Sequence, residues 1–173
     1  MKAFFDIDTQ IDFVFPAGAL YAPGAENVIP NVAKLNRLAG ERGLPLISTM
    51  CAHGENAEEF NVWPPHCIKG TVGQQKPAAT LVPNQIFIEK DELDLFTNPS
   101  LEKLLETLKI DECVVYGVLT EYCVKFAIMG LLKRGCKVSL VTDAIHHLSE
   151  TEAAKVIRDF TDAGGICIQT AEV

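Results

Sequence analysis

The chain has 173 residues, of which 48% are hydrophobic and 22% are charged, and its formal net charge at pH 7 is −8. This length favours one domain over residues 1–173, and the hydrophobic content argues against disorder. Because the net charge is negative and the lysines and arginines are scattered, nucleic acid and anionic membrane surfaces are disfavoured as partners.

The first thirteen residues, MKAFFDIDTQIDF, already carry acidic side chains, and no later apolar run reaches the roughly 18 residues of a membrane span. We therefore expect an intracellular, cytoplasmic protein that does not bind membranes. In that compartment its six cysteines are expected to be reduced thiols. Four of them are interpreted as structural: Cys67, Cys113, Cys136 and Cys167. The other two, Cys51 and Cys123, are candidates for chemistry.

Six short apolar segments predict β-strands, at residues 2–8, 44–49, 85–89, 113–118, 137–143 and 165–170. Helical patterns are expected from Val28 to a stop at Gly43, and at residues 100–108, 121–134 and 149–163. Apolar strands that alternate with amphipathic helices are typical of parallel sheets covered on both faces. The pattern predicts a single-domain, three-layer α/β fold with a six-stranded, mostly parallel sheet flanked by helices.

The segment from 50 to 84 interrupts this alternation. It contains Trp63, two histidines and four prolines, and it is far longer than the roughly 4–6 residues of an ordinary connection. In open α/β sheets, ligands bind beyond the carboxyl ends of the strands. Asp8, Lys90 and Gly117 would emerge at that edge, so we expect the long segment to be functional.

Cys123 lies in the first turn of the helix expected at 121–134, just after a strand that breaks at Gly117. The positive end of a helix and a nearby cation lower the pKa of a thiol, which is about 8.5 for free cysteine. This position favours a nucleophile. The alternative is that Cys123 is a small, buried hydrophobic residue.

Asp6, Asp8 and Asp12 surround the end of the first strand, where a buried carboxylate is costly unless it is paired. Lys90 ends the third strand, and it could point into the crevice or into solvent. A carboxylate that accepts the thiol proton, an ammonium that stabilises the thiolate and backbone N–H groups that hold an oxyanion would together perform acyl transfer.

Four segments carry recognisable motifs: DIDTQIDF at 6–13, WPPHCIKGTVGQQ at 63–75, FIEK at 87–90 and GVLTEYCV at 117–124. They resemble the isochorismatase-like cysteine hydrolases, and within them the nicotinamidase/pyrazinamidase branch. The resemblance runs nearly end to end and implies a sheet ordered 3-2-1-4-5-6. It also implies that Asp8, Lys90 and Cys123 are catalytic.

The same resemblance implies a cis peptide between Val118 and Leu119, with the N–H groups of Leu119 and Cys123 directed at the oxyanion. Phe13 and Trp63 occupy positions where the family sandwiches a flat ring; ordinary core packing is the alternative for both. The implied reaction is conversion of nicotinamide to nicotinic acid and ammonia through a thioester, which would serve NAD salvage.

Nicotinamidases carry a metal site beside the catalytic residues, and its positions correspond here to Cys51, His53, Glu59 and His66. Two of these four differ in type from the family pattern. Because thiolate, imidazole and carboxylate all bind zinc or iron, the resemblance implies one divalent metal, which would hold the ring nitrogen of the substrate. No organic cofactor is expected. The alternative is that the two histidines are hydrogen-bonded to backbone.

Other functions stay open. The same mechanism could act on another small amide, a carbamoyl compound or a ureide. The chain could instead be a non-catalytic or redox-sensing relative with Cys51 and Cys123 as reactive thiols, although Asp8 and Lys90 argue against this. Isochorismate hydrolysis is disfavoured because cleavage of a vinyl ether needs acid catalysis rather than an acyl intermediate. Family members often assemble, so we expect a homo-oligomer.

Overall fold

Six parallel strands form one sheet in the order β3-β2-β1-β4-β5-β6. The computed structural model describes residues 1–173. The strands are β1 (Lys2–Ile7), β2 (Leu46–Cys51), β3 (Ile86–Lys90), β4 (Glu112–Val118), β5 (Lys137–His146) and β6 (Ile166–Ile168). The predicted α/β fold and strand order are confirmed, and the sheet is parallel throughout.

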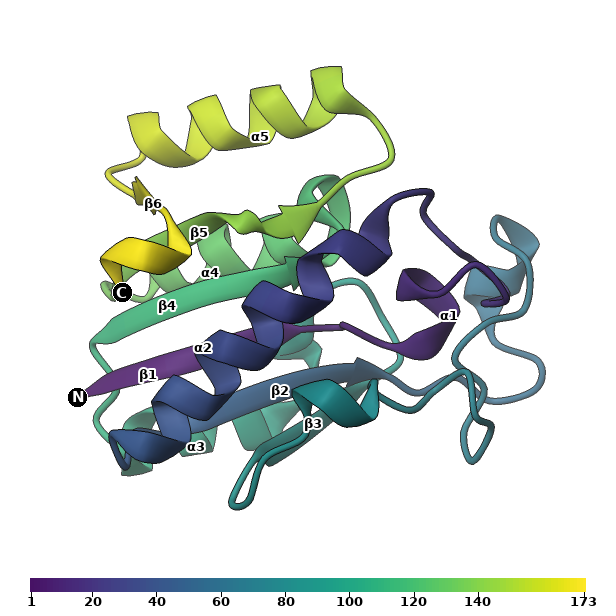
Figure 1. The fold of residues 1–173 in the computed structure, drawn as a ribbon, viewed down its shortest axis with the longest axis horizontal. Helices are drawn as coiled ribbons and strands as arrows, with labels where there is room; N and C mark the ends of the chain where they lie inside the picture. Colours follow the sequence, from purple (N-terminus) through teal and green to yellow (C-terminus); the bar gives the residue numbers. More distant parts are fainter.

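Helices cover both faces of this sheet (Figure 1). They are α1 (Ile11–Val14), α2 (Ile29–Glu41), α3 (Pro99–Thr107), α4 (Lys125–Lys133) and α5 (Glu150–Asp162). Helix α2 crosses the front of the sheet, α3 and α4 lie behind it, and α5 contacts α4. Two of the helices have an N-terminal side-chain cap. The Asn98 side chain accepts a hydrogen bond from the Ser100 N–H at the start of α3, and the Ser149 side chain accepts one from the Glu152 N–H at the start of α5. None of the helices combines the length and apolarity that crossing a membrane requires.

The core lies on the two central strands. In β1, Phe4 and Phe5 point to opposite faces of the sheet, and both are fully buried, because layers of helices cover each face. The edge strands are more exposed. Cys167, which the sequence analysis interpreted as structural, lies exposed on β6, a three-residue strand with a neighbour on one side only.

The carboxyl ends of all six strands lie at one edge of the sheet, where α1 and much of the long segment from 50 to 84 also lie (Figure 1). The chain connects β1 to strands on one side of it and then crosses to β4 on the other side. Such a switch point leaves a crevice beyond the strand ends. Residues that follow β1, β2, β3 and β4 therefore meet there.

Candidate active site

Asp8 follows β1 and is held against β2. Its backbone has a φ of 46°, in the left-handed region that aspartate tolerates better than most residues. Its N–H donates to the carbonyl of Thr49 at 3.3 Å, and its Oδ1 accepts the Thr49 hydroxyl at 2.6 Å. Asp8 is fully buried, so its carboxylate has one orientation, towards the crevice.

Lys90 points into the crevice and not into solvent. Its Nζ lies 2.8 Å from Oδ2 of Asp8, 3.2 Å from Sγ of Cys51 and 3.4 Å from Sγ of Cys123. A fourth contact, at 3.0 Å, is to the carbonyl of Glu92. One ammonium thus contacts one carboxylate and two sulfurs.

The ion pair keeps both groups charged despite their burial. Burial raises the pKa of Asp8, but the charge of Lys90 and hydrogen bonds from Cys123, Lys90 and Thr49 hold that pKa below its ordinary value. Burial opposes the charge of Lys90, yet Asp8 and the two sulfurs raise the pKa of Lys90 well above its ordinary value. The site therefore holds a carboxylate and an ammonium at neutral pH.

Cys123 lies in a kinked turn, Thr120–Val124, that directly precedes α4. The expected helix over 121–134 is thus correct in place but irregular at its start, because Tyr122 has non-helical angles of φ −119° and ψ −107°. The carboxylate of Glu121 anchors this turn by accepting the N–H groups of Leu148 and Ser149, both at 2.8 Å.

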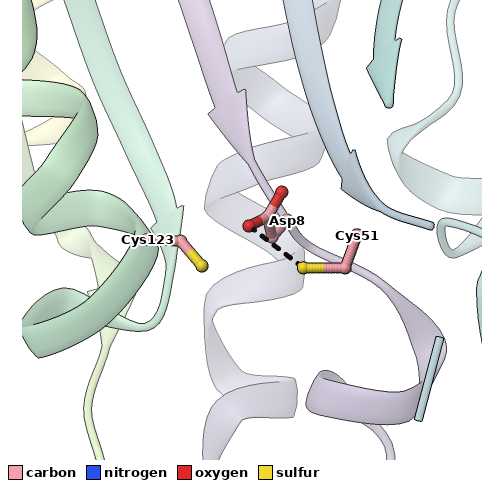
Figure 2. Close-up of side chains that lie close together, drawn as sticks. All are labelled: Asp8, Cys51 and Cys123. Atoms are coloured by element: carbon pink, nitrogen blue, oxygen red, sulfur yellow. Dashed lines mark hydrogen bonds between the residues drawn. The ribbon is translucent and has the colours of Figure 1, made fainter. Parts of the chain in front are cut away.

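Cys51 belongs to the same cluster as the nucleophile candidate. Its sulfur lies 3.6 Å from Oδ2 of Asp8, and Figure 2 shows the thiols of Cys51 and Cys123 converging from opposite sides of that carboxylate. The hydrogen bond from Cys123 lowers the pKa of Cys51 to about 7, and the same contact raises the pKa of Cys123. Because both sulfurs face the ammonium of Lys90, the first proton lost from these two thiols is a property of the pair and not of either cysteine alone.

A narrow pocket opens beside the sulfur of Cys123, with a cavity volume of about 30 Å³, and ten of its twelve lining residues are hydrophobic. Phe13, Trp63 and Leu119, three of the residues singled out from the sequence, are among those that line it. The peptide between Val118 and Leu119 is cis. The pocket therefore gathers the residues expected for ring binding and for the oxyanion.

Four lining residues were not identified from the sequence: Leu20, Leu93, Tyr122 and Leu148. The ring of Tyr122 stands edge-on to that of Trp63, with 5.5 Å between centroids, and the ring of Phe13 lies 5.4 Å from that of His66. For Tyr122 the signal was available, because it directly precedes Cys123 within the motif.

Asp6 and Asp12, the other two acids near β1, have structural roles. Asp6 pairs with the buried ammonium of Lys76 at 3.0 Å, beneath the site. Asp12 accepts the N–H of Cys67 at 2.7 Å and that of Ala19 at 2.9 Å, which ties the long segment to α1. Both carboxylates thereby anchor the segment that carries Trp63.

A second group of possible ligands lies at the pocket wall. The side chains of His53, Glu59 and His66 offer ligand atoms that all lie within 4.8 Å of one another. The Nε2 of His53 is 3.6 Å from Glu59, and that of His66 is 3.8 Å from it. Cys51, which the family resemblance placed with these three residues, has its thiol in the cluster of Asp8 and Cys123, where that thiol also contacts the His53 side chain.

The histidines of this group are oriented as metal ligands usually are. The Nδ1 of His53 contacts Asp91 at 2.6 Å, and the Nδ1 of His66 contacts the carbonyl of Pro64 at 2.8 Å. Each ring thus directs its Nε2 towards Glu59, and the buried Nε2 of His53 has no hydrogen-bond partner. An outer partner on one nitrogen and a free inner nitrogen fit a divalent metal.

Comparison with known proteins gives the family. The family model described as the isochorismatase domain matches residues 2–172. The chain belongs to this family. It is 25% identical to the nicotinamidase of Escherichia coli strain K12 over 99% of this chain and 96% of the relative. A "probable inactive nicotinamidase" of Arabidopsis thaliana is also 25% identical, over 80% of this chain and 76% of that protein.

Solved structures of related proteins support the same family assignment. The crystal structure of a pyrazinamidase of Pyrococcus horikoshii in complex with zinc superimposes with a TM-score of 0.92 at 28% identity, covering 97% of this chain and 98% of that one. The resemblance to the nicotinamidase/pyrazinamidase branch is therefore confirmed for this isochorismatase-family chain.

Proposed function

We propose that this isochorismatase-family chain is a cysteine-dependent amidohydrolase that acts on a small, flat amide, with nicotinamide as the leading substrate. The observation that carries the proposal is the position of the Lys90 ammonium, in contact with the Asp8 carboxylate at 2.8 Å and the Cys123 sulfur at 3.4 Å. The nicotinamidase and pyrazinamidase relatives support the substrate class.

In the first half of the reaction, Cys123 gives its proton to Asp8 while its sulfur bonds to the amide carbon. The resulting oxyanion accepts the N–H groups of Leu119 and Cys123, the donors that the family resemblance implies. Asp8 then returns the proton to the leaving nitrogen, the C–N bond breaks, and ammonia departs from a thioester on Cys123.

In the second half, water attacks the thioester carbon and gives a proton to Asp8. The C–S bond breaks, the carboxylic acid is released, and the Cys123 sulfur recovers a proton from Asp8. Lys90 stays an ammonium throughout, because its pKa is raised well above its ordinary value, and it stabilises whichever anion the cycle produces.

The pocket favours a flat and uncharged substrate. Phe13, Trp63 and Tyr122 line it with aromatic rings, which pack against a planar heterocycle by stacking or edge contacts. A carboxylate product is charged, so it binds this apolar lining less well than the amide does.

We further propose that His53, Glu59 and His66 hold one divalent metal, zinc or iron. The zinc-bound pyrazinamidase of P. horikoshii supports zinc in a related chain. Three protein ligands leave a coordination position open, and the bound metal would offer it to a ring nitrogen of the substrate. The metal would then select among amides, while the covalent steps depend on Asp8, Lys90 and Cys123.

Ammonia release from a panel of amides tests the proposal. The purified protein, loaded with zinc or with iron, would be supplied with nicotinamide, pyrazinamide, an N-carbamoyl amino acid and a ureide. We expect nicotinamide to give the highest kcat/KM and the Cys123→Ala variant to release no ammonia above background. A preference for the carbamoyl compound would move the assignment to that substrate class, and no release from any compound would favour a non-catalytic relative.

A further inference from the structure

We propose that Asp8, Cys51 and Cys123 form a second cation site, which takes a thiophilic divalent ion, such as cadmium or zinc in excess of the metal held by the histidine group, and thereby blocks the nucleophile. One carboxylate oxygen and two sulfurs, all on buried residues, lie within 4.8 Å of one another. The three side chains come from the residue after β1, the end of β2 and the turn before α4, and they converge on one point (Figure 2). This donor set shares no ligand with the histidine group at the pocket wall, although Cys51 contacts His53 and the two groups are neighbours.

The spacing of the three ligand atoms suits such an ion. Zinc binds sulfur at about 2.3 Å and carboxylate oxygen at about 2.0–2.2 Å, so two sulfurs on a tetrahedral zinc lie about 3.8 Å apart. That separation falls within the 4.8 Å range found here. Cys51 and Cys123 also line the pocket, which gives an ion a path from solvent to both sulfurs.

Lys90 shows that these atoms already surround a cation position. Its ammonium contacts all three at once, at 2.8 Å from Asp8, 3.2 Å from Cys51 and 3.4 Å from Cys123. A divalent ion carries twice the charge and forms shorter bonds to soft sulfur ligands, so it competes with the ammonium for them. Lys90 keeps the carbonyl of Glu92, now at 3.0 Å, as a partner when it withdraws.

Charge balance permits this exchange in a buried place. The Asp8 carboxylate and the Lys90 ammonium now cancel. When the ion binds, both thiols become thiolates and release two protons to solvent, and the three negative ligands are matched by the divalent ion and the ammonium. Because the cluster stays neutral, no uncompensated buried charge results. No oxidation or reduction is involved.

The histidine group has a different ligand preference. Its imidazole and carboxylate donors come from His53, His66 and Glu59, whereas the second site has two sulfurs, which select soft ions. Cadmium therefore distinguishes the two metal sites.

The predicted loss of turnover rests on the proposed function, since Cys123 must be the nucleophile. The predicted binding of cadmium does not depend on that function.

The test is a titration of the chelator-treated, full-length chain with cadmium chloride, followed by the ultraviolet charge-transfer absorption of cadmium–thiolate bonds. In the unmodified chain, the absorption should rise until one equivalent of cadmium has been added and then stay constant. It should also do so in a His53→Ala/His66→Ala variant and in Cys167→Ser, which removes an exposed cysteine far from the site. Cys51→Ser and Cys123→Ser should each weaken cadmium binding at least tenfold.

A second measurement needs no substitution. Bound cadmium should protect Cys51 and Cys123 together from alkylation by iodoacetamide, as read by peptide mass spectrometry. Unchanged cadmium absorption in Cys51→Ser, or its loss in the histidine variant alone, would overturn the proposal. Absorption that rises as expected without any amidase activity would instead refute the proposed function and leave the cation site standing.

Discussion

The ammonium of Lys90 lies 2.8 Å from the carboxylate of Asp8, and neither side chain has any solvent-exposed surface. The pair joins the end of β3 to the residue after β1, across the end of β2. Removal of one partner from a buried ion pair leaves an uncompensated charge. The two residues that we propose as catalytic are therefore also expected to stabilise the fold.

Lys90→Met should lower the free energy of unfolding by about 3–5 kcal/mol, because Asp8 would be left buried and unpaired. Urea unfolding measures this change. The matched control is Lys2→Met, which removes a partly exposed pair with Glu112 at 3.1 Å and should cost less than about 1 kcal/mol. Equal losses of unfolding free energy in the two variants would show that the buried pair stabilises the fold no more than an exposed pair does.

The stability of the chain should depend on Asp8 at low pH. The folded-state pKa of Asp8 is depressed, so its contribution is complete above the unfolded value of about 3.9 and is lost as the pH falls through the folded value. Lys90 behaves oppositely: its raised pKa keeps its contribution complete below the unfolded value of about 10.4, and the contribution is lost only as the pH rises through the folded value.

Unfolding in urea from pH 7 down to pH 2 checks this expectation for Asp8. The difference in unfolding free energy between the unmodified chain and Asp8→Asn should be constant from pH 7 to about pH 5, and it should shrink below about pH 4. The control is Asp162→Asn, which removes an exposed carboxylate at the end of α5. A difference for Asp8→Asn that does not change with pH would contradict the pairing.

Metal affinity should depend on Asp91, although it is not among the ligands. Its carboxylate contacts the Nδ1 of His53 at 2.6 Å and thereby orients the Nε2 that would bind the metal. Asp91→Ala should lower the affinity for zinc about 10–100-fold in a chelator competition. Glu92→Ala, which removes the carboxylate of the exposed neighbour, is the control. An equal loss of zinc affinity in both variants would show that the negative charge of the loop, and not the contact with His53, determines the affinity.

Substrate affinity should depend on the edge-on pair of Trp63 and Tyr122, whose centroids are 5.5 Å apart. Trp63→Ala should raise the KM for nicotinamide several-fold, because an aromatic contact contributes about 0.5–1.5 kcal/mol beyond its buried area. Trp63→Phe should restore most of the affinity. Phe87→Ala, an exposed position on β3, should leave the KM unchanged. Steady-state kinetics with ammonia detection would show an unaltered KM in Trp63→Ala if the ring binds elsewhere.

Much of the fold follows from local patterns in the sequence. Apolar runs identified all six strands because a parallel sheet buries both faces of its central strands, as Phe4 and Phe5 show. The positions of Asp8, Lys90 and Cys123 followed from motifs at strand ends, and parallel strands place such ends together.

The rest depends on contacts between distant parts of the chain. Nothing in the sequence around Cys51 indicates that its thiol contacts Lys90 as well as His53, because the contact with Lys90 depends on the relative placement of β2 and β3. Leu148 lies in the pocket because Glu121 accepts its N–H at 2.8 Å. Periodicity within one segment cannot reveal a contact of this kind.

The central claim is that Cys123 forms a thioester with the acyl group of the amide. Rapid acid quenching of the reaction with nicotinamide, followed by intact-protein and peptide mass spectrometry, measures it directly. We predict a nicotinoyl adduct that maps to Cys123, is absent from Cys123→Ala and accumulates before ammonia release reaches steady state. Turnover by Cys123→Ala at the unmodified rate, or an adduct on Cys51 alone, would contradict the account.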